Sequence, residues 1–260
     1  MELKFSKEKT LESKKEMNYY GSLCTEMYEI LHATPPQDEL DFYLSFAKKE
    51  MAIFEPLCGN GRFMIPFVER ELNIYGNDLS QEMLDKCLLK CPKAQVDCCD
   101  IIKFKTDRKF DYIFIPSGSI GLFTDLKVLE KILKNFHSML NERGRLVFAV
   151  DTTFFKAENN DEYKIVRDVE FDHKRLILKI KSFYDEKNHT QFQPQVYELL
   201  DGKKVLQSEE MDFQIHLYDI HEMDDILTRV GFKKFKTYTD YDKNYKLDGK
   251  NEFLIYDCEK

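Results

Sequence analysis

Three acidic residues in the first half of the sequence, Glu55, Asp78 and Asp100, each follow a short apolar segment closely. Carboxylates accept hydrogen bonds from ammonium groups, hydroxyls and amino groups, so this residue type suits a ligand with several donors. If the apolar segments are neighbouring parallel strands, their carboxyl ends lie along one edge of a sheet, where such sheets bind ligands. We therefore expect the three carboxylates to face one ligand. The segments are Met51–Phe54, Ile74–Gly76 and Ala94–Cys98.

The loop after the first of these segments contains two glycines, Gly59 and Gly61, and leads into a predicted helix. Glycines let the backbone approach a ligand closely, and the amides at a helix start bind anionic groups. A dinucleotide-binding fingerprint needs a third glycine at the position of Met64. Glu55 is a poor neighbour for a pyrophosphate and a good one for an ammonium. The loop therefore favours a ligand with both an ammonium and a carboxylate, and a nicotinamide-dependent oxidoreductase is the less favoured alternative.

Helices and strands alternate between residues 51 and 150, which predicts an α/β fold with a parallel, doubly wound sheet. The last helix of this stretch is expected to end with Gly144 as a left-handed cap. Beyond the three segments already named, the expected strands are Phe110–Ile115 and Arg145–Val150, and the expected helices are Arg62–Leu72, Ser80–Leu89 and Asp125–Leu140.

Between Tyr163 and Tyr218 the pattern changes to antiparallel strands. Apolar and polar residues alternate up to Leu217, and Asp201-Gly202 is typical of a hairpin turn. His216 and Tyr218 fall on the polar face, where they are candidates for lining a substrate cavity; an exposed strand face is the alternative. The expected organisation is an N-terminal helical cap over residues 1–50, a Rossmann-like domain over residues 51–162 and 219–260, and an antiparallel insertion over the active site at residues 163–218.

Four segments resemble, in sequence order, successive motifs of the class I S-adenosylmethionine-dependent methyltransferases. The similarity runs from about Asp41 to Asp151, and Asp219–Phe235 resembles the late helix and strand of that family. The resemblance implies a seven-stranded, mainly parallel Rossmann-like sheet and S-adenosylmethionine as the cofactor. The four segments are Phe54–Arg62, Gly76–Leu84, Phe110–Ser117 and Leu140–Val147.

The resemblance also implies roles for the matching positions. Asp78 would bind the ribose, Asp100 with Ile101 would contact the edge of the adenine, and Pro116–Gly118 would lie beside the sulfonium and the substrate. Tyr20 is added because N-terminal segments close over the cofactor in related enzymes. The expected cofactor-binding residues are Tyr20, Glu55, Cys58, Gly59, Asn60, Gly61, Arg62, Asp78, Leu79, Met83, Asp100, Ile101, Pro116 and Ser117, and the expected substrate-binding residues are Gly118, His216 and Tyr218.

One position departs from the pattern of the family. Leu57 stands where the family has a glycine. A leucine adopts a positive φ only at a cost. We therefore expect the loop to take a slightly different path at this residue.

The net charge of −8 gives no general attraction to nucleic acid, and no nucleic-acid partner is expected. The first fifteen residues lack the apolar core of a secretory signal, and no apolar run approaches the roughly 20 residues that span a bilayer. A cytoplasmic protein without membrane contact is the resulting prediction. The seven cysteines lie scattered, including Cys87, Cys91, Cys98 and Cys99, and are expected to be buried free thiols, with no metal site.

The expected reaction is transfer of a methyl group to a nitrogen or oxygen of a small molecule, because the insertion resembles the sheets that cover pockets in small-molecule methyltransferases. Such a displacement depends mainly on alignment, so no catalytic nucleophile is required, and the sequence singles out no catalytic residue. The expected assembly is a monomer or a homodimer. A non-catalytic S-adenosylmethionine-binding module shares the same loop and is the alternative from another functional class.

Overall fold

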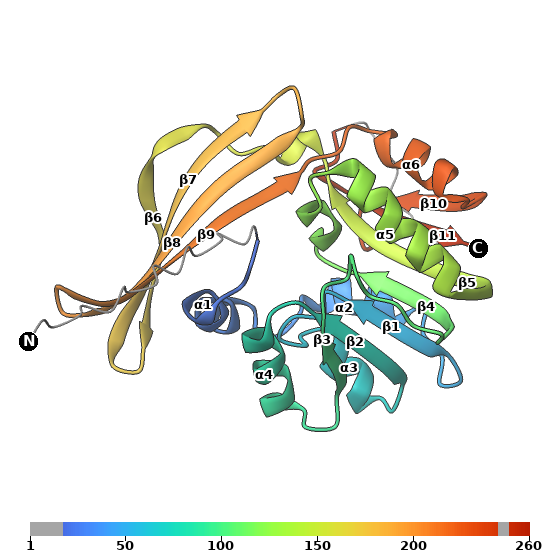
Figure 1. The fold of residues 1–260 in the computed structure, drawn as a ribbon, viewed down its shortest axis with the longest axis horizontal. Helices are drawn as coiled ribbons and strands as arrows, with labels where there is room; N and C mark the ends of the chain where they lie inside the picture. Colours follow the sequence, from blue (N-terminus) through green and yellow to red (C-terminus); the bar gives the residue numbers. More distant parts are fainter. Residues whose placement is uncertain (1–17, 244–249) are drawn as a thin grey trace, which may run out of the picture.

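The computed structural model describes residues 18–243 and 250–260, and two β-sheets form its framework (Figure 1). The larger sheet has seven strands in the order β3-β2-β1-β4-β5-β11-β10. The first five strands along the chain pair in parallel, and β11 runs antiparallel to both of its neighbours. The predicted Rossmann-like sheet is therefore confirmed. Its strands are β1 (Ala52–Pro56), β2 (Asn73–Asp78), β3 (Gln95–Cys98), β4 (Phe110–Ile115), β5 (Leu140–Asp151), β10 (Lys234–Tyr238) and β11 (Phe253–Glu259).

Helices cover both faces of this sheet because its central strands are apolar on both faces. Successive strand residues point to opposite sides, so Ile53 and Phe54 enter different clusters of the core. One cluster packs against α5 and α6, and the other against α2, α3 and α4. The helices are α2 (Gln37–Leu44), α3 (Met64–Glu69), α4 (Gln81–Lys90), α5 (Leu126–Met139) and α6 (Glu222–Val230), with short 3-10 turns η1 (Ser119–Leu122) and η2 (Thr153–Phe155).

The second sheet is an antiparallel meander in the order β6-β7-β8-β9, inserted between β5 and α6. It begins a few residues before the expected Tyr163 and ends at His216, where the chain turns back into the larger sheet. Figure 1 shows it extending away from the Rossmann-like unit, with α1 (Ser22–His32) beside it. The strands are β6 (Asn160–Phe171), β7 (Lys174–Asp185), β8 (Thr190–Asp201) and β9 (Lys204–His216).

Helix α1 connects the two sheets. Its apolar face, which includes Leu23 and Met27, packs on the meander. Its polar face reaches α4, where Glu26 pairs with Lys86 at 2.7 Å and Glu29 pairs with Lys90 at 2.9 Å. Of the described part of the expected N-terminal cap, α1 therefore lies between the two sheets, whereas α2 packs on a face of the larger sheet. Residues 1–17 of that cap lie outside the described residues.

The start of α1 is capped by a residue far away in the sequence. The carboxylate of Glu209 on β9 accepts hydrogen bonds from the amides of Leu23 at 2.8 Å and Cys24 at 3.1 Å. A Cβ on Gly21 would lie 2.8 Å from this carboxyl group, so the glycine leaves room for the carboxylate to approach the helix start in this position. A negative charge at a helix start also interacts favourably with the positive end of the helix dipole. The single carboxylate of Glu209 therefore joins α1 to the meander.

Two smaller expectations are wrong. Gly144 is not a left-handed cap: α5 ends at Met139, and Arg143 takes the positive φ of 64° instead. Gly144 is required for space, because a Cβ there would lie 2.8 Å from the carbonyl oxygen of Asn141. All seven cysteines are free, but Cys98 is exposed rather than buried.

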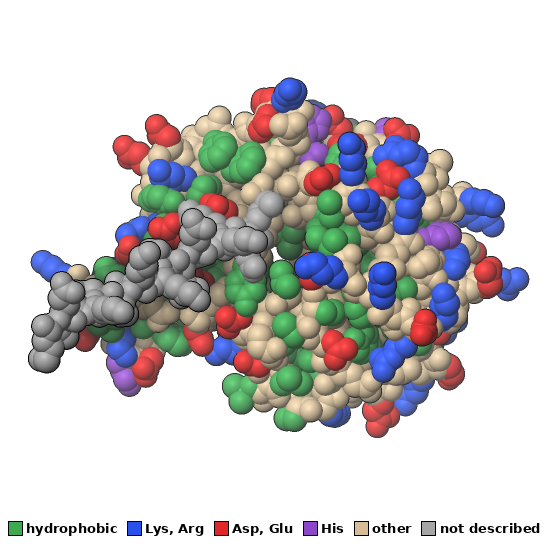
Figure 2. All heavy atoms as spheres, in the orientation of Figure 1, with side chains coloured by type: hydrophobic (Ala, Val, Ile, Leu, Met, Phe, Trp, Pro, Cys, Tyr) green, Lys and Arg blue, Asp and Glu red, His purple; other side chains and the backbone are tan. Residues whose placement is uncertain are grey.

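None of the helices in the described part of the chain is long and apolar enough to cross a membrane. On the face shown in Figure 2, acidic and basic side chains lie interspersed, without a large area of one sign.

We predict that Glu209→Ala lowers the free energy of unfolding by about 1–2 kcal/mol, since two helix-start amides lose their acceptor. Urea denaturation measures this loss, and hydrogen exchange should locate it in α1. Glu170→Ala, at an exposed position of β6, is the control and should change little. Equal stabilities of the two variants would contradict the capping role.

Candidate functional site

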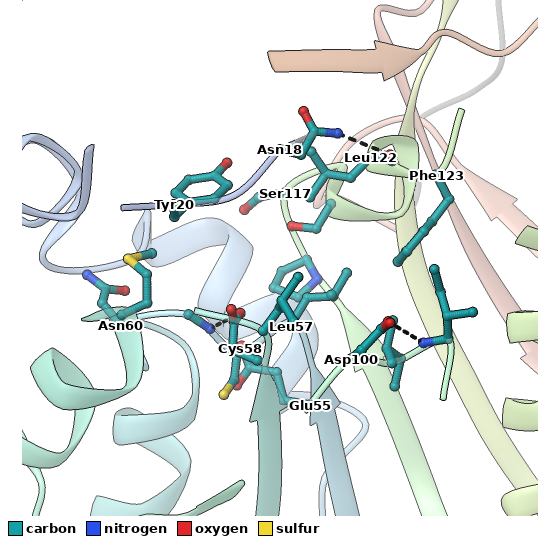
Figure 3. A pocket seen from close by; sticks show the side chains of 18 of the residues that line it. Asn18, Tyr20, Glu55, Leu57, Cys58, Asn60, Asp100, Ser117, Leu122 and Phe123 are labelled. Atoms are coloured by element: carbon teal, nitrogen blue, oxygen red, sulfur yellow. Dashed lines mark hydrogen bonds between the residues drawn. The ribbon is translucent and has the colours of Figure 1, made fainter. Parts of the chain in front are cut away.

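A cavity of about 360 Å³ opens at the carboxyl ends of β1, β2 and β4 (Figure 3). This volume is in the range of small-molecule sites. Of the expected site residues, those that line it are Tyr20, Glu55, Cys58, Gly59, Asn60, Arg62, Asp78, Leu79, Met83, Asp100, Ile101, Pro116 and Ser117.

Glu55 is the most deeply buried acid of the cavity. Its side chain is only 2% exposed, and its Oε2 atom has no hydrogen-bond partner among the described residues. Burial raises the pKa of Glu55 well above its usual value, Arg62 opposes this rise, and Asp78 adds to it. A buried carboxylate oxygen without a donor is costly. The position therefore suits a ligand that brings a cationic donor to it.

Asp78 fixes the loop after β1. Its Oδ2 accepts a hydrogen bond from the amide of Gly59, and its Oδ1 accepts one from the amide of Ser80, both at 2.9 Å. Burial raises the pKa of Asp78, and these backbone hydrogen bonds counteract the rise. A carboxylate has about four acceptor positions, so each oxygen of Asp78 can accept a further donor from the cavity.

The far end of the cavity combines one acid with apolar walls. Asp100 accepts a hydrogen bond from the amide of Ile102 at 2.9 Å and pairs with Lys103 at 3.3 Å. Ile101 and Met83 are each only 4% exposed, so a flat ring in this region would be held between apolar surfaces. This combination suits a purine with an exocyclic amino group.

Arg62 crosses the other end of the cavity. Its guanidinium donates a hydrogen bond to the Ser117 hydroxyl at 2.6 Å and lies 5.6 Å from the centre of the Tyr28 ring. Ser117 in turn donates to the buried Glu39 carboxylate through its amide at 2.9 Å and its hydroxyl at 3.0 Å. Burial raises the pKa of Glu39, although these hydrogen bonds and Arg62 oppose the rise.

A second acid, after Glu39, lies behind the loop that follows β4 and contains Ser117. The Asp151 carboxylate, at the end of β5, is 2.7 Å from where a Cβ on Gly118 would be, and Gly118 has a φ of +67°. Burial, together with the charge of Glu39, raises the pKa of Asp151 to about 6. The loop that follows β4 is therefore backed by two carboxyl groups.

The segment before α1 closes the cavity opposite β1, as Figure 3 shows for Asn18 and Tyr20. The Asn18 amide donates hydrogen bonds to the carbonyls of Leu122 at 3.2 Å and Gln214 at 2.9 Å. The Tyr20 carbonyl accepts a hydrogen bond from the Ser80 hydroxyl at 2.7 Å. These contacts join the segment to η1, to β9 and to α4.

Four expected site residues do not line the cavity. Gly61 has a φ of +77°, and a Cβ there would collide with the Cys87 thiol, so its glycine allows the loop to pack on α4. Gly118 faces Asp151 instead. His216 and Tyr218 are 3% and 0% exposed, because the chain enters the joint between the two sheets at the end of β9.

Sequence reasoning missed part of the cavity wall. The sequence around Asn18 has no pattern that predicts a place in the cavity wall, because the partners of Asn18 are backbone carbonyls distant in sequence. The segment at the end of η1 was also missed, although its apolar pair Leu122-Phe123, in the connection between the fourth strand and the next helix, was a usable signal. The lining residues not expected are Asn18, Tyr28, Leu57, Phe63, Ile102, Ser119, Leu122, Phe123, Thr124, Asp125 and Val128.

Residues 53–144 match a family model described as "Methyltransferase domain". These residues run from β1 to the start of β5, and they carry the cavity apart from its N-terminal wall.

Residues 53–144 are a methyltransferase domain. Its fold is that of S-adenosylmethionine-dependent methyltransferases.

The chain also resembles YqeM, a proposed methyltransferase from Bacillus subtilis strain 168. The two are 27% identical over 139 residues, which cover 51% of this chain and 56% of YqeM. The chain thus matches only about half the length of this curated relative.

Three solved structures have the same fold over most of the chain. An S-adenosylmethionine-dependent methyltransferase from Clostridium acetobutylicum has a TM-score of 0.73 at 18% identity and covers 90% of this chain and 96% of its own. The CcbJ methyltransferase from Streptomyces caelestis has a TM-score of 0.74 at 15% identity, with 92% and 96% covered. The sugar N-methyltransferase KedS8 from a Streptoalloteichus species has a TM-score of 0.70 at 16% identity, with 89% and 91% covered.

Leu57 adopts the left-handed region itself, with a φ of 60°, which is the conformation that a glycine would take freely at this position. Its side chain packs against the core beneath the sheet, which holds it in place. The structure around Leu57 therefore compensates for a conformation that costs a leucine about 1–2 kcal/mol.

We predict that Leu57→Gly is more stable than Leu57→Ala by about 1 kcal/mol. Both variants lose the contacts of the leucine side chain, but only glycine adopts the positive φ freely. Denaturant unfolding of the two purified variants measures the difference. An alanine variant as stable as the glycine variant would show that the left-handed conformation is not retained.

Proposed function

We propose that this protein transfers a methyl group from S-adenosylmethionine to a nitrogen or oxygen atom of a small molecule. The observation that carries the proposal is the Glu55 carboxylate, which is buried in the cavity with Oε2 unpartnered. An amino-acid ammonium group supplies the missing donor. Three acids along the cavity would also repel a pyrophosphate, which disfavours a dinucleotide.

The remaining assignments follow the shape of the cavity. Asp78 would bind the ribose hydroxyls through its free acceptor positions, and Asp100 would accept from the adenine amino group. Arg62 would be available to the cofactor carboxylate. When bound, S-adenosylmethionine supplies an electrophilic methyl group on a sulfonium. The chain itself has to align the acceptor with that methyl group and exclude water, since alignment is the main requirement of the displacement.

We propose that the acceptor binds beside the Pro116–Gly118 loop, under the meander, and that nitrogen is favoured over oxygen. Two carboxyl groups, Glu39 and Asp151, back this loop. An alkylammonium has to lose a proton before its nitrogen can attack. The raised pKa of Asp151, about 6, leaves its carboxylate ionised at neutral pH and basic enough to assist.

The name of one structural neighbour, the sugar N-methyltransferase KedS8, supports a small amine acceptor. The interspersed charges in Figure 2 supply no basic surface for nucleic acid on that face. The cytoplasmic location and the monomeric or dimeric state stay predictions from the sequence.

The activity test uses the full chain with S-adenosylmethionine and two acceptor sets, amino sugars and their hydroxyl counterparts, beside a small-molecule cell extract. We expect S-adenosylhomocysteine to form, faster with the amino sugars than with the hydroxyl counterparts. Mass spectrometry of products and of S-adenosylhomocysteine measures this. Binding of S-adenosylhomocysteine without turnover in any mixture would instead support a non-catalytic module.

The cofactor site is tested by calorimetry with S-adenosylhomocysteine. Asp78→Asn should weaken binding about tenfold or more, because charge-assisted hydrogen bonds to the ribose are lost. Asp85→Asn, on the exposed side of α4, is the matched control and should bind like the unmodified protein. An unchanged affinity in Asp78→Asn would refute the ribose assignment, and tighter binding of NADH than of S-adenosylhomocysteine would overturn the choice of cofactor.

A further inference from the structure

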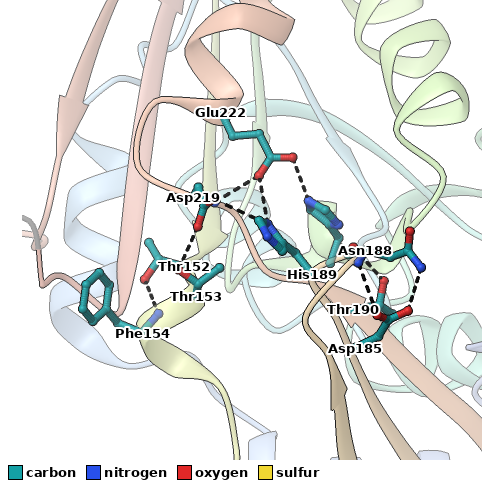
Figure 4. Close-up of polar contacts among 10 residues, drawn as sticks. Thr152, Thr153, Phe154, Asp185, Asn188, His189, Thr190, Asp219 and Glu222 are labelled. Carbon is teal, nitrogen blue, oxygen red and sulfur yellow. Dashed lines mark hydrogen bonds and ion pairs between the residues drawn. The ribbon is translucent and has the colours of Figure 1, made fainter.

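A second polar cluster lies outside the cavity, at the joint between the meander and the Rossmann-like unit (Figure 4). His189 belongs to the turn before β8, His216 ends β9, and Glu222 begins α6. Their ligand-capable atoms all lie within 4.8 Å of one another. None of the three lines the cavity, so the proposed methyl transfer does not explain why they converge.

The distances in this cluster are close to those of a coordination shell. His216 Nε2 is 3.0 Å from Glu222 Oε1, and His189 Nδ1 is 3.8 Å from Glu222 Oε2. Asp219 adds a fourth group, with its Oδ2 atom 3.7 Å from His189 Nδ1. Donor atoms at about 2.0–2.1 Å from a tetrahedral zinc ion are about 3.3 Å apart. Small side-chain movements would therefore convert these contacts into ligands.

The backbone holds the donors in place. His189 has a left-handed φ of 48°, and its carbonyl accepts a hydrogen bond from the amide of Leu217 at 2.8 Å. Left-handed residues other than glycine are costly and often occur at functional sites. His216 is only 3% exposed, and its Nδ1 has no partner among the described residues, so its one polar contact is made by Nε2.

An ordinary ion pair on the same helix provides a comparison. His221 Nδ1 lies 2.8 Å from Asp224 Oδ2 on an exposed surface, and this pair has no second imidazole. At the joint, the imidazole of a turn residue, His189, and that of a strand residue, His216, instead approach the two oxygens of one carboxylate. Imidazole nitrogen and carboxylate oxygen together are the donor set of zinc and similar transition metals, whereas magnesium and calcium prefer oxygen alone.

We propose that His189, His216 and Glu222 bind a divalent transition-metal ion, zinc by their chemistry, with Asp219 or water as the fourth ligand. The ion would tie β8, β9 and α6 together and fix the meander against the Rossmann-like unit. Its role is structural, because the site is separate from the cavity. The proposal is independent of the proposed function, and its test needs no methyl acceptor.

The test titrates the chelator-treated full chain with zinc chloride alone, using calorimetry, and measures bound metal after desalting. We expect one zinc ion per chain, with a Kd on the order of 1 μM or tighter, and a raised midpoint of thermal unfolding. His189→Ala should weaken zinc binding by at least about tenfold and abolish the thermal shift. Its side chain is partly exposed, so the variant is expected to fold, and S-adenosylhomocysteine binding reports that the cavity is intact.

Two further variants make the result specific. Glu222→Gln removes a ligand by a nearly isosteric change and should weaken zinc binding like His189→Ala. His221→Ala removes the neighbouring imidazole of the ordinary ion pair and should bind zinc like the unmodified protein. The proposal is overturned if the unmodified chain takes up no zinc, or if His189→Ala and Glu222→Gln bind it as tightly as His221→Ala does.

Discussion

The burial of the Glu55 carboxylate at the end of β1 constrains the whole cavity. The surrounding strands exclude solvent from this group, and the chain supplies no donor to one of its oxygens. A charge in that situation is stable only if a ligand or a proton compensates it. The neighbouring Asp78 cannot compensate the charge of Glu55, because Asp78 is itself an acid. Its carboxylate accepts hydrogen bonds from the amides of Gly59 and Ser80. The end of the sheet thus provides a buried carboxylate that favours the binding of a cationic group.

The walls opposite β1 come from parts of the chain that are distant in sequence, and they are joined by a few polar contacts. Asn18 links η1 to β9 through backbone carbonyls, and Glu209 on β9 caps α1. Asn60, in the loop after β1, donates to Glu29 of α1 at 2.7 Å. Because the same helix packs on the meander and contacts the loop after β1, the position of the meander and the closure of the cavity are mechanically linked.

The sequence predicted the Rossmann-like sheet and most of the cavity because both depend on local patterns. Alternating apolar segments set the strands, and acids at strand ends fall on one edge in any parallel sheet of this order. Contacts between distant segments were beyond such reasoning. Asn18 carries no local pattern, and His216 and Tyr218 alternate like surface strand residues although the joint between the sheets buries them. Leu57 shows the reverse case, since a local penalty was correctly identified but tertiary packing outweighs it.

The distribution of charge also bears on the proposed reaction. Methyl transfer converts a cationic sulfonium into a neutral thioether and places the positive charge on an acceptor nitrogen. The charge therefore moves from the sulfonium to an acceptor beside the loop that Glu39 and Asp151 back, while the charge of the ammonium at Glu55 does not change. The carboxyl groups of Glu39 and Asp151 would stabilise the positive charge on the acceptor nitrogen after transfer. A neutral hydroxyl acceptor would be stabilised less by Glu39 and Asp151. This is the physical reason for preferring nitrogen as the methylated atom.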